Sequence, residues 1–253
     1  MPYIAIRDLS LYYEEAGSGI PVILLHGATG SIDPPNGGWS RFMPTLAHQY
    51  HVIAIEHRGH GRTNNPQGYL TYSMIADDIV EFILKQQLSS AHILGISDGA
   101  IVALHLAMFY PERVQSVVAL GANYWNDDQV REANRFADLD RIDREHPTWV
   151  EEIRRIHDRH KYPGYWRELL RQLAENLAVN PQYTVADLER ISVPTLLMAG
   201  EHDLWANLDQ MYTMRRSIPG AEMLIVNNGG HLINLSHPHI VEPVISDFLQ
   251  RHS

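Results

Sequence analysis

Short apolar runs alternate with segments of helical periodicity along most of this chain. Runs such as residues 21–25 and 51–55 are continuous rather than alternating, as in strands that are covered on both faces of a sheet. The segment 73–87 between two such runs places its apolar residues at helical spacing. This alternation predicts an α/β fold, with a mostly parallel sheet covered by helices on both faces.

The same patterns divide the chain into a core and an insertion. A hairpin is predicted over 3–7 and 10–16, and further strands over 21–25, 51–55, 91–96, 114–120, 194–199 and 221–226. Helices are predicted over 39–48, 73–87, 98–110, 206–217 and 238–251. The alternation stops after Gly121, and residues 122–190 are charged, aromatic and helical in period. We expect an α/β core formed by 1–121 and 191–253, with a helical lid, 122–190, inserted after the sixth strand.

Composition excludes several classes of function. The net charge of -10 over 253 residues argues against a nucleic-acid groove or an anionic membrane surface as partner. The absence of Cys excludes disulfides, thiol catalysis and thiolate metal sites. The first residues lack a basic segment followed by a long apolar one, and no apolar run approaches the length of a membrane span. A cytoplasmic protein that acts on a small molecule is the expectation, with its oligomeric state left open.

The pentapeptide Gly95-Ile96-Ser97-Asp98-Gly99 stands between a predicted strand and a predicted helix. In that position a G-x-S-x-G sequence forms a sharp turn that exposes the serine hydroxyl. Glycines on either side allow the strand and the helix to approach each other closely. Since a serine hydroxyl is a weak nucleophile on its own, Ser97 needs a neighbouring base if it is to react.

Polar residues that could supply this base follow the other predicted strands. Ligands bind beyond the carboxyl ends of strands in open α/β sheets, so these residues are expected at one edge. Glu201-His202-Asp203 follows the strand 194–199, and Gly229-Gly230-His231 follows 221–226. A serine, a carboxylate and a histidine therefore occur there in the chain order Ser97, Asp203, His231. That order is typical of one class of serine triad.

Five motifs in this order give the chain a resemblance to α/β-hydrolase-fold serine hydrolases over essentially its whole length. They are the HG loop (26–30), the RGxG turn (58–61), the G-x-S-x-G turn, and the GEHD and GGH segments. Ser97-Asp98-Gly99-Ala100 and Leu120-Gly121-Ala122-Asn123-Tyr124 are similar to the valacyclovir hydrolase (biphenyl hydrolase-like) branch. Glu56 departs from the family pattern, which often has Asp before the RGxG turn, and this affects only the expected loop geometry.

The resemblance implies acyl transfer without a cofactor or metal. His231 would take the Ser97 proton, Ser97 would attack an ester carbonyl, and Asp203 would orient the imidazole. The backbone N–H groups of Asp98 and Ala28 would form the oxyanion hole.

Each of these assignments has a structural alternative. Ser97 could be an ordinary turn residue, His231 could stabilise its loop, and Asp203 could cap a helix. Glu201, Asp127 and Asp128 are alternative acids for the histidine. His26 is interpreted as a loop anchor. The remaining histidines form no H-E-x-x-H or comparable metal motif, so no metal site is predicted.

Asp98 and the aromatic residues of the lid bear on the substrate. The branch resemblance implies that the Asp98 carboxylate pairs with a substrate ammonium, as in an amino-acid ester; alternatively it points into solvent or caps the helix that it begins. Tyr124, Trp125, Trp149 and Trp166 are candidates for lining an apolar pocket, or for packing the lid on the core.

Three functions are compatible with these patterns. The first is a serine hydrolase that cleaves carboxylic esters of small molecules, amino-acid esters among them. The second keeps the fold but changes the reaction, as in a C–C bond hydrolase, an enol-lactonase or a perhydrolase. The third is a non-catalytic ligand-binding protein. An Asp nucleophile would point to a dehalogenase or an epoxide hydrolase, and this chain has Ser97 instead.

Overall fold

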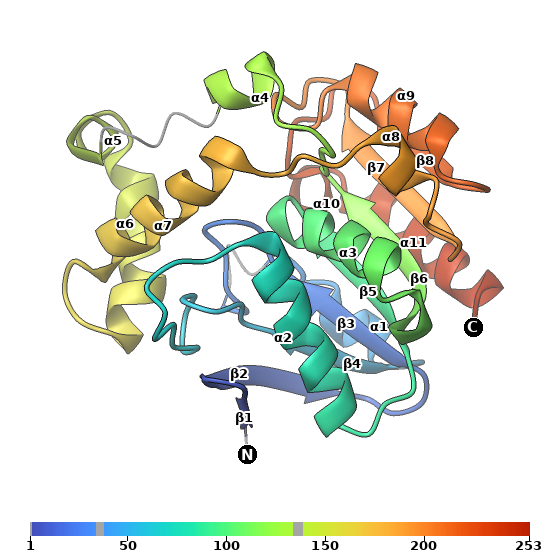
Figure 1. Cartoon of the computed structure of the whole chain (residues 1–253), viewed down its shortest axis with the longest axis horizontal. Helices are drawn as coiled ribbons and strands as arrows, with labels where there is room; N and C mark the ends of the chain where they lie inside the picture. Colours follow the sequence, from blue (N-terminus) through green and yellow to red (C-terminus); the bar gives the residue numbers. More distant parts are fainter. Residues whose placement is uncertain (1, 34–37, 134–138) are drawn as a thin grey trace.

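Strands rich in Val, Ile and Leu occupy the centre of the molecule because both of their faces are buried. The computed structural model describes residues 2–33, 38–133 and 139–253. Within these residues, eight strands form one sheet in the order β1-β2-β4-β3-β5-β6-β7-β8 (Figure 1). The strands are Tyr3–Ile6 (β1), Leu9–Ala16 (β2), Pro21–Leu25 (β3), His51–Ile55 (β4), Ala91–Ile96 (β5), Val114–Leu120 (β6), Thr195–Gly200 (β7) and Glu222–Val226 (β8).

The pairing of the strands agrees with the predicted pattern. The β1–β2 and β2–β4 pairs are antiparallel, and the pairs from β4 across the sheet to β8 are parallel. The central strands β3 to β6 have the predicted bounds, and β7 is shifted by one residue. The predicted α/β fold with a mostly parallel sheet is confirmed.

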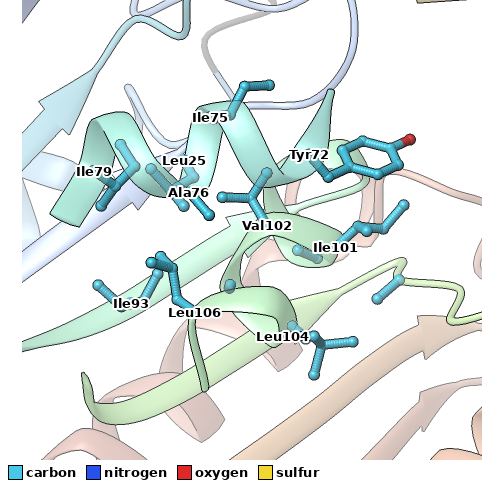
Figure 2. Packing of buried hydrophobic residues seen from close by; sticks show 14 of the residues in the cluster. Leu25, Tyr72, Ile75, Ala76, Ile79, Ile93, Ile101, Val102, Leu104 and Leu106 are labelled. Carbon is cyan, nitrogen blue, oxygen red and sulfur yellow. The ribbon is translucent and has the colours of Figure 1, made fainter. Parts of the chain in front are cut away.

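Helices cover both faces of this sheet. On one face α2 packs on α3, and α3 packs on β5 and β6; on the other, α11 closes a second apolar cluster. Figure 2 shows the first face, where Ile75 and Ile79 of α2 lie above Val102 and Leu106 of α3. The helices are Met43–Leu46 (α1), Tyr72–Lys85 (α2), Asp98–Phe109 (α3), Asp128–Ala133 (α4), Leu139–Glu145 (α5), Pro147–His157 (α6), Tyr165–Val179 (α7), Val185–Leu188 (α8), Leu208–Ser217 (α9), Ile233–Ser236 (α10) and Pro238–Arg251 (α11).

The helix predicted over 39–48 is much shorter than expected. Only Met43–Leu46 is α-helical, and Pro44 stands in its first turn, where its missing N–H removes no helical bond. The Trp39 indole N–H donates to the carbonyl of Leu25, 3.0 Å away inside the core. This tertiary bond holds the start of the segment in a turn, which periodicity alone did not indicate.

Residues 122–190 leave the sheet after β6 and return to it at β7. Their described residues form helices α4 to α8, and an isolated antiparallel bridge joins Trp125 to Gln182 at the two ends of the insertion. Residues 134–138 of the predicted lid lie outside the described residues. Helix α6 buries Val150, Ile153 and Ile156 and leaves its charged side exposed, as its period predicts. Among the described residues, no helix is both long and apolar enough to cross a bilayer.

The strand order reverses at β3, which lies between β4 and β5. The loop after β3 and the turn after β5 therefore diverge, and they leave a crevice at the carboxyl edge of the sheet. The candidate site lies at this reversal.

Candidate active site

Ser97 occupies a strained turn between β5 and α3. Its φ of 52° and ψ of -120° lie in a region that residues with a side chain rarely adopt, while its N–H donates to the carbonyl of Leu120 at 2.8 Å. The turn is tight: a Cβ on Gly95 would lie 2.1 Å from the carbonyl oxygen of Gly99, and one on Gly99 would lie 2.5 Å from that of Leu25. Only glycine fits at these two positions, as predicted from the G-x-S-x-G spacing.

His231 lies between Ser97 and Asp203. Its Nε2 is 2.9 Å from the Ser97 Oγ, and its Nδ1 is 2.9 and 2.8 Å from the two carboxylate oxygens of Asp203. The structure thus brings together three residues that stand 106 and 28 positions apart in the chain. The positive φ of Gly121, 68°, lets the backbone pass close to the ring, since a Cβ there would lie 3.0 Å from its Cε1.

The Asp203 carboxylate is held in its charged form. Burial by itself would raise its pKa, but the hydrogen bond and charge of His231 lower the pKa below its usual value. The backbone N–H groups of Trp205 and Ala206 also donate to Asp203 Oδ1, at 2.9 and 3.0 Å. With Nδ1–H donating to this carboxylate, the His231 Nε2 is left as the acceptor that faces Ser97.

The other predicted acids lie elsewhere. Glu201 accepts from the N–H of Asn228 at 2.9 Å, and Asp127 accepts from the N–H of Val130 at 2.8 Å and from side-chain amides of α9 and its start. Asp128 is fully exposed and pairs with Arg131. Asp203 is therefore the carboxylate that reaches the histidine. Among the described residues, no group of three or more His, Cys, Asp or Glu is arranged to hold a metal ion.

The loop after β3 passes directly beside Ser97. A Cβ on Gly27 would lie 3.2 Å from the Cβ of Ser97, and Ala28 lines the same pocket as Ser97 and Asp98. The two predicted oxyanion-hole residues, Ala28 and Asp98, thus flank the serine. Asp98 is the first residue of α3, at the positive end of the helix dipole.

The Asp98 side chain turns into the protein rather than into solvent. Its carboxylate is buried, lines the pocket and accepts a hydrogen bond from the Tyr72 hydroxyl at 3.1 Å. Burial raises the pKa of Asp98 to about 6, although the Tyr72 bond and the charge of His231 act in the opposite direction. The alternative in which this carboxylate points into solvent is wrong.

A pocket of about 300 Å³ opens over Ser97. Its wall is mostly apolar, and Asp98 and Asn123 are among its polar lining residues. The remaining lining residues are Gly27, Ala28, Thr29, Gly30, Gly38, Ile96, Trp149, Leu177, Trp205, His231, Leu232 and Leu235. Of the four aromatic residues predicted as candidates for the pocket wall, only Trp149 lines this pocket.

The other three nominated aromatics pack elsewhere. Trp166 is buried beneath the guanidinium groups of Arg154 and Arg167, Trp125 is 42% exposed, and Tyr124 packs against the core. Trp205 lines the pocket instead, with its ring 4.8 Å from that of His231, and the sequence analysis missed it. Its place two residues after Asp203 was the signal that could have indicated it.

Sequence comparison agrees with this geometry: a model described as the alpha/beta hydrolase family matches residues 22–244. The chain belongs to this family. It is therefore a hydrolase of the α/β-fold family. The narrower branch resemblance is not established by these matches.

Members with different reactions are comparably similar to it. A putative carbamate hydrolase RutD of Azorhizobium caulinodans is 25% identical over 98% of each chain. The 3-oxoadipate enol-lactonase 1 of Acinetobacter baylyi is 24% identical over 88% of this chain and 87% of its own. The structure of a meta-cleavage product hydrolase of Pseudomonas fluorescens superposes with a TM-score of 0.81 at 21% identity, over 99% of this chain and 98% of that one. The family thus leaves the substrate undetermined.

Proposed function

We propose that this protein is a serine hydrolase that cleaves carboxylic esters of small molecules through an acyl-enzyme. The observation that carries the proposal is the position of His231, within hydrogen-bond reach of both the Ser97 hydroxyl and the Asp203 carboxylate. A serine with an adjacent, oriented base is the arrangement that nucleophilic catalysis requires.

The reaction proceeds in two halves. As the Ser97 Oγ bonds to the ester carbon, its proton passes to His231 Nε2; the imidazolium then gives this proton to the departing alcohol. A water molecule repeats the attack on the acyl-enzyme, with His231 again taking and returning the proton. Asp203 stays ionised and stabilises the imidazolium. The N–H groups of Ala28 and Asp98 stabilise the tetrahedral oxyanion, where one lost donor typically costs about 2.7–4 kcal/mol.

The pocket favours esters over the anionic substrates that some relatives are named for. Asp98 places a carboxylate inside it, and no Arg or Lys is among its described lining residues. A substrate such as a 3-oxoadipate derivative, which carries a carboxylate, would meet like-charge repulsion there. Trp149, Leu177 and Leu232 offer an apolar wall for the acyl or alcohol group, and the 122–190 helices act as the lid over it.

Asp98 is also the proposed determinant for a cationic substrate. The carboxylate lines the pocket beside the nucleophile and accepts a hydrogen bond from a neutral hydroxyl, so a substrate ammonium would give it a positively charged partner. We therefore propose α-amino esters as preferred substrates.

A comparison of matched esters tests the role of Asp98. We expect Asp98→Asn to lower kcat/KM about 10- to 100-fold for valine esters and to leave their des-amino counterparts nearly unchanged. In the wild type, kcat/KM for the valine ester divided by kcat/KM for its des-amino counterpart should fall as pH drops below about 6, where Asp98 takes up a proton. It should also fall above about 8, where an α-amino group loses its charge. Equal losses on both sets of esters would contradict this role.

Labelling with a fluorophosphonate and turnover of p-nitrophenyl acetate test the function as a whole. The wild type should label and turn over, while Ser97→Ala should not label and should lose about a million-fold in kcat. A folded wild type that does neither would instead be a ligand-binding protein. A substrate panel of acyl esters, amino-acid esters, lactones and dienone ring-cleavage products separates the remaining reactions, and faster turnover of a dienone than of any ester would overturn the ester assignment.

A further inference from the structure

Buried histidines form hydrogen bonds with backbone carbonyls of the loop that carries the Ala28 N–H. The His26 Nδ1 lies 2.8 Å from the carbonyl oxygen of Gly27, in the same peptide unit as the Ala28 N–H. The His26 Nε2 accepts from the N–H of His57 at 3.1 Å, which leaves Nδ1 as the donor. On the next peptide, the Ala28 carbonyl lies 2.5 Å from the His60 Nε2. These contacts come from the core of the protein.

The third carbonyl of the loop is held by the insertion instead. His157, the last residue of α6, is fully buried, and its Nε2 lies 3.1 Å from the carbonyl oxygen of Thr29. Its Nδ1 accepts from the N–H of Gly61 in the RGxG turn at 3.0 Å, so the ring proton is on Nε2 and is donated to Thr29. One neutral imidazole thus joins the lid to two loops at the carboxyl edge of the sheet.

We propose that His157 is a positioning residue that fixes the orientation of loop 26–31, and with it the Ala28 N–H, relative to Ser97. The inference rests on the proposed function, because that function gives the Ala28 N–H its role. It also makes the geometry of the oxyanion hole depend on the seating of helix α6, although α6 begins 50 residues after Ser97.

The bond from His157 to Thr29 can affect the Ala28 N–H because the peptide units that carry these two groups are separated by only one other along the loop. The Thr29 carbonyl shares a planar peptide unit with the Gly30 N–H, which donates to the Gly27 carbonyl at 3.0 Å. That Gly27 carbonyl shares its own planar unit with the Ala28 N–H. If the Thr29 carbonyl loses its donor, this buried group must turn to find another partner, because an unpaired buried carbonyl is costly. Such a turn pulls the Gly30 N–H away from the Gly27 carbonyl and releases the peptide unit that carries the Ala28 N–H, and a displacement of that N–H by about 1 Å can cost about 100-fold in rate.

The lid makes other bonds to the core that serve as controls. The Tyr165 hydroxyl, at the start of α7, donates to the carbonyl of Gly59 at 2.7 Å in a buried position. This bond also attaches the lid, but it does not touch loop 26–31. Tyr165→Phe therefore removes a buried bond between lid and core without altering the proposed link.

Two substitutions separate the two hydrogen bonds of the His157 ring, the one with Gly61 and the one with Thr29. In His157→Asn the amide stands near the position of Nδ1, so the acceptor for Gly61 is kept and the donor to Thr29 is lost. In His157→Gln the amide reaches the position of Nε2, so the donor to Thr29 is kept. Each variant, and Tyr165→Phe, is tested by three measurements. These are steady-state kinetics on p-nitrophenyl acetate, thermal unfolding, and hydrogen exchange of the amides of residues 27–31.

We expect His157→Asn to lower kcat about 10- to 100-fold with KM changed less than about threefold, and to speed exchange in 27–31 about tenfold. His157→Gln should retain most of kcat, and Tyr165→Phe should lose stability without losing kcat. Equal kcat values for His157→Asn and Tyr165→Phe would overturn the inference.

The remaining outcomes are also decisive. If His157→Asn does not fold, a large loss of kcat in His157→Gln, which keeps the donor, contradicts the inference. A wild type that turns over no ester overturns the proposed function. Exchange in 27–31 that is the same in His157→Asn as in the wild type overturns the positioning role, whether or not the protein turns over an ester.

Discussion

Asp98 and Asp203 are both buried and both feel the charge of His231, yet their pKa values shift in opposite directions. Asp203 accepts from His231 and from two backbone N–H groups, and these donors hold its pKa below the usual value. Asp98 accepts from the Tyr72 hydroxyl, which is too little to offset burial, and its pKa rises to about 6. Hydrogen-bond donors rather than exposure separate the two roles: one orients a base, and the other faces the pocket.

Asp203→Asn tests whether Asp203 acts by holding the His231 ring in the tautomer that can accept from Ser97. An Asn amide can donate to the His231 Nδ1, which turns the ring into the tautomer whose Nε2 carries the proton and cannot accept from Ser97. We expect kcat to fall about 10⁴-fold while the melting temperature stays close to that of the wild type. Glu201→Gln, two residues away and outside the triad, is the matched control. Comparable losses in the two variants would show that Asp203 has no special part.

The strand β5, the turn at Ser97 and helix α3 form the element on which the site is built. Its bounds followed from the sequence because a continuous apolar run, two glycines and a helical segment are local signals. Helix α1 did not follow in the same way, since the Trp39 bond to the Leu25 carbonyl is a contact between distant segments. Three of the four predicted pocket aromatics were misplaced for a similar reason: Trp149 and Trp166 both lie in helices of the insertion, but only Trp149 lines the pocket.

Gly99→Ala tests how tightly this element is packed against its neighbour. The added methyl would lie 2.5 and 2.6 Å from the carbonyl oxygens of Leu25 and His26, which belong to backbone that cannot easily move. We expect unfolding free energy to fall by about 3 kcal/mol or more, measured by denaturant titration. Gly230→Ala, with no atom within 4 Å of the added carbon, should change it by less than about 0.5 kcal/mol. Similar values for the two would refute this account of the turn.

At the scale of the whole molecule, several histidines are buried in their neutral form. Among the described residues, burial lowers the pKa of seven histidines, to about 4 for His92 and His105 and to about 3 for His157. The other four are His160 and three residues at the carboxyl edge of the sheet, His26, His57 and His60. Unfolding exposes all seven fully to water, where the ordinary pKa is 6.5, so the unfolded chain binds more protons below that pH.

Folding stability should therefore fall as pH drops from about 6.5 toward 4. Lowered histidine pKa values stabilise the fold above 6.5 and lose this contribution progressively below it. Glu56 and Asp98, whose pKa values burial raises to about 7 and 6, act in the opposite direction and reduce the effect. We expect unfolding near pH 5.5 to take up about three protons, measured from the pH dependence of the unfolding free energy. His92→Gln, far from the site, should reduce this uptake by about one, and a stability that is flat over this range would contradict the prediction.

The amino-acid sequence by itself determined the α/β fold, the bounds of the central strands, the turn at Ser97 and the candidate serine and histidine, but it left the acid open among Asp203, Glu201, Asp127 and Asp128. These follow from local patterns and from chain order, because parallel strands must present their carboxyl ends at one edge. Only the tertiary structure decided which aromatic side chains face the pocket, that Asp98 points inward to Tyr72, and that His157 contacts the loop of Ala28. Those facts depend on how a helical insertion is rotated and seated on the sheet, and amphipathic periodicity places a residue on a face without stating what that face meets.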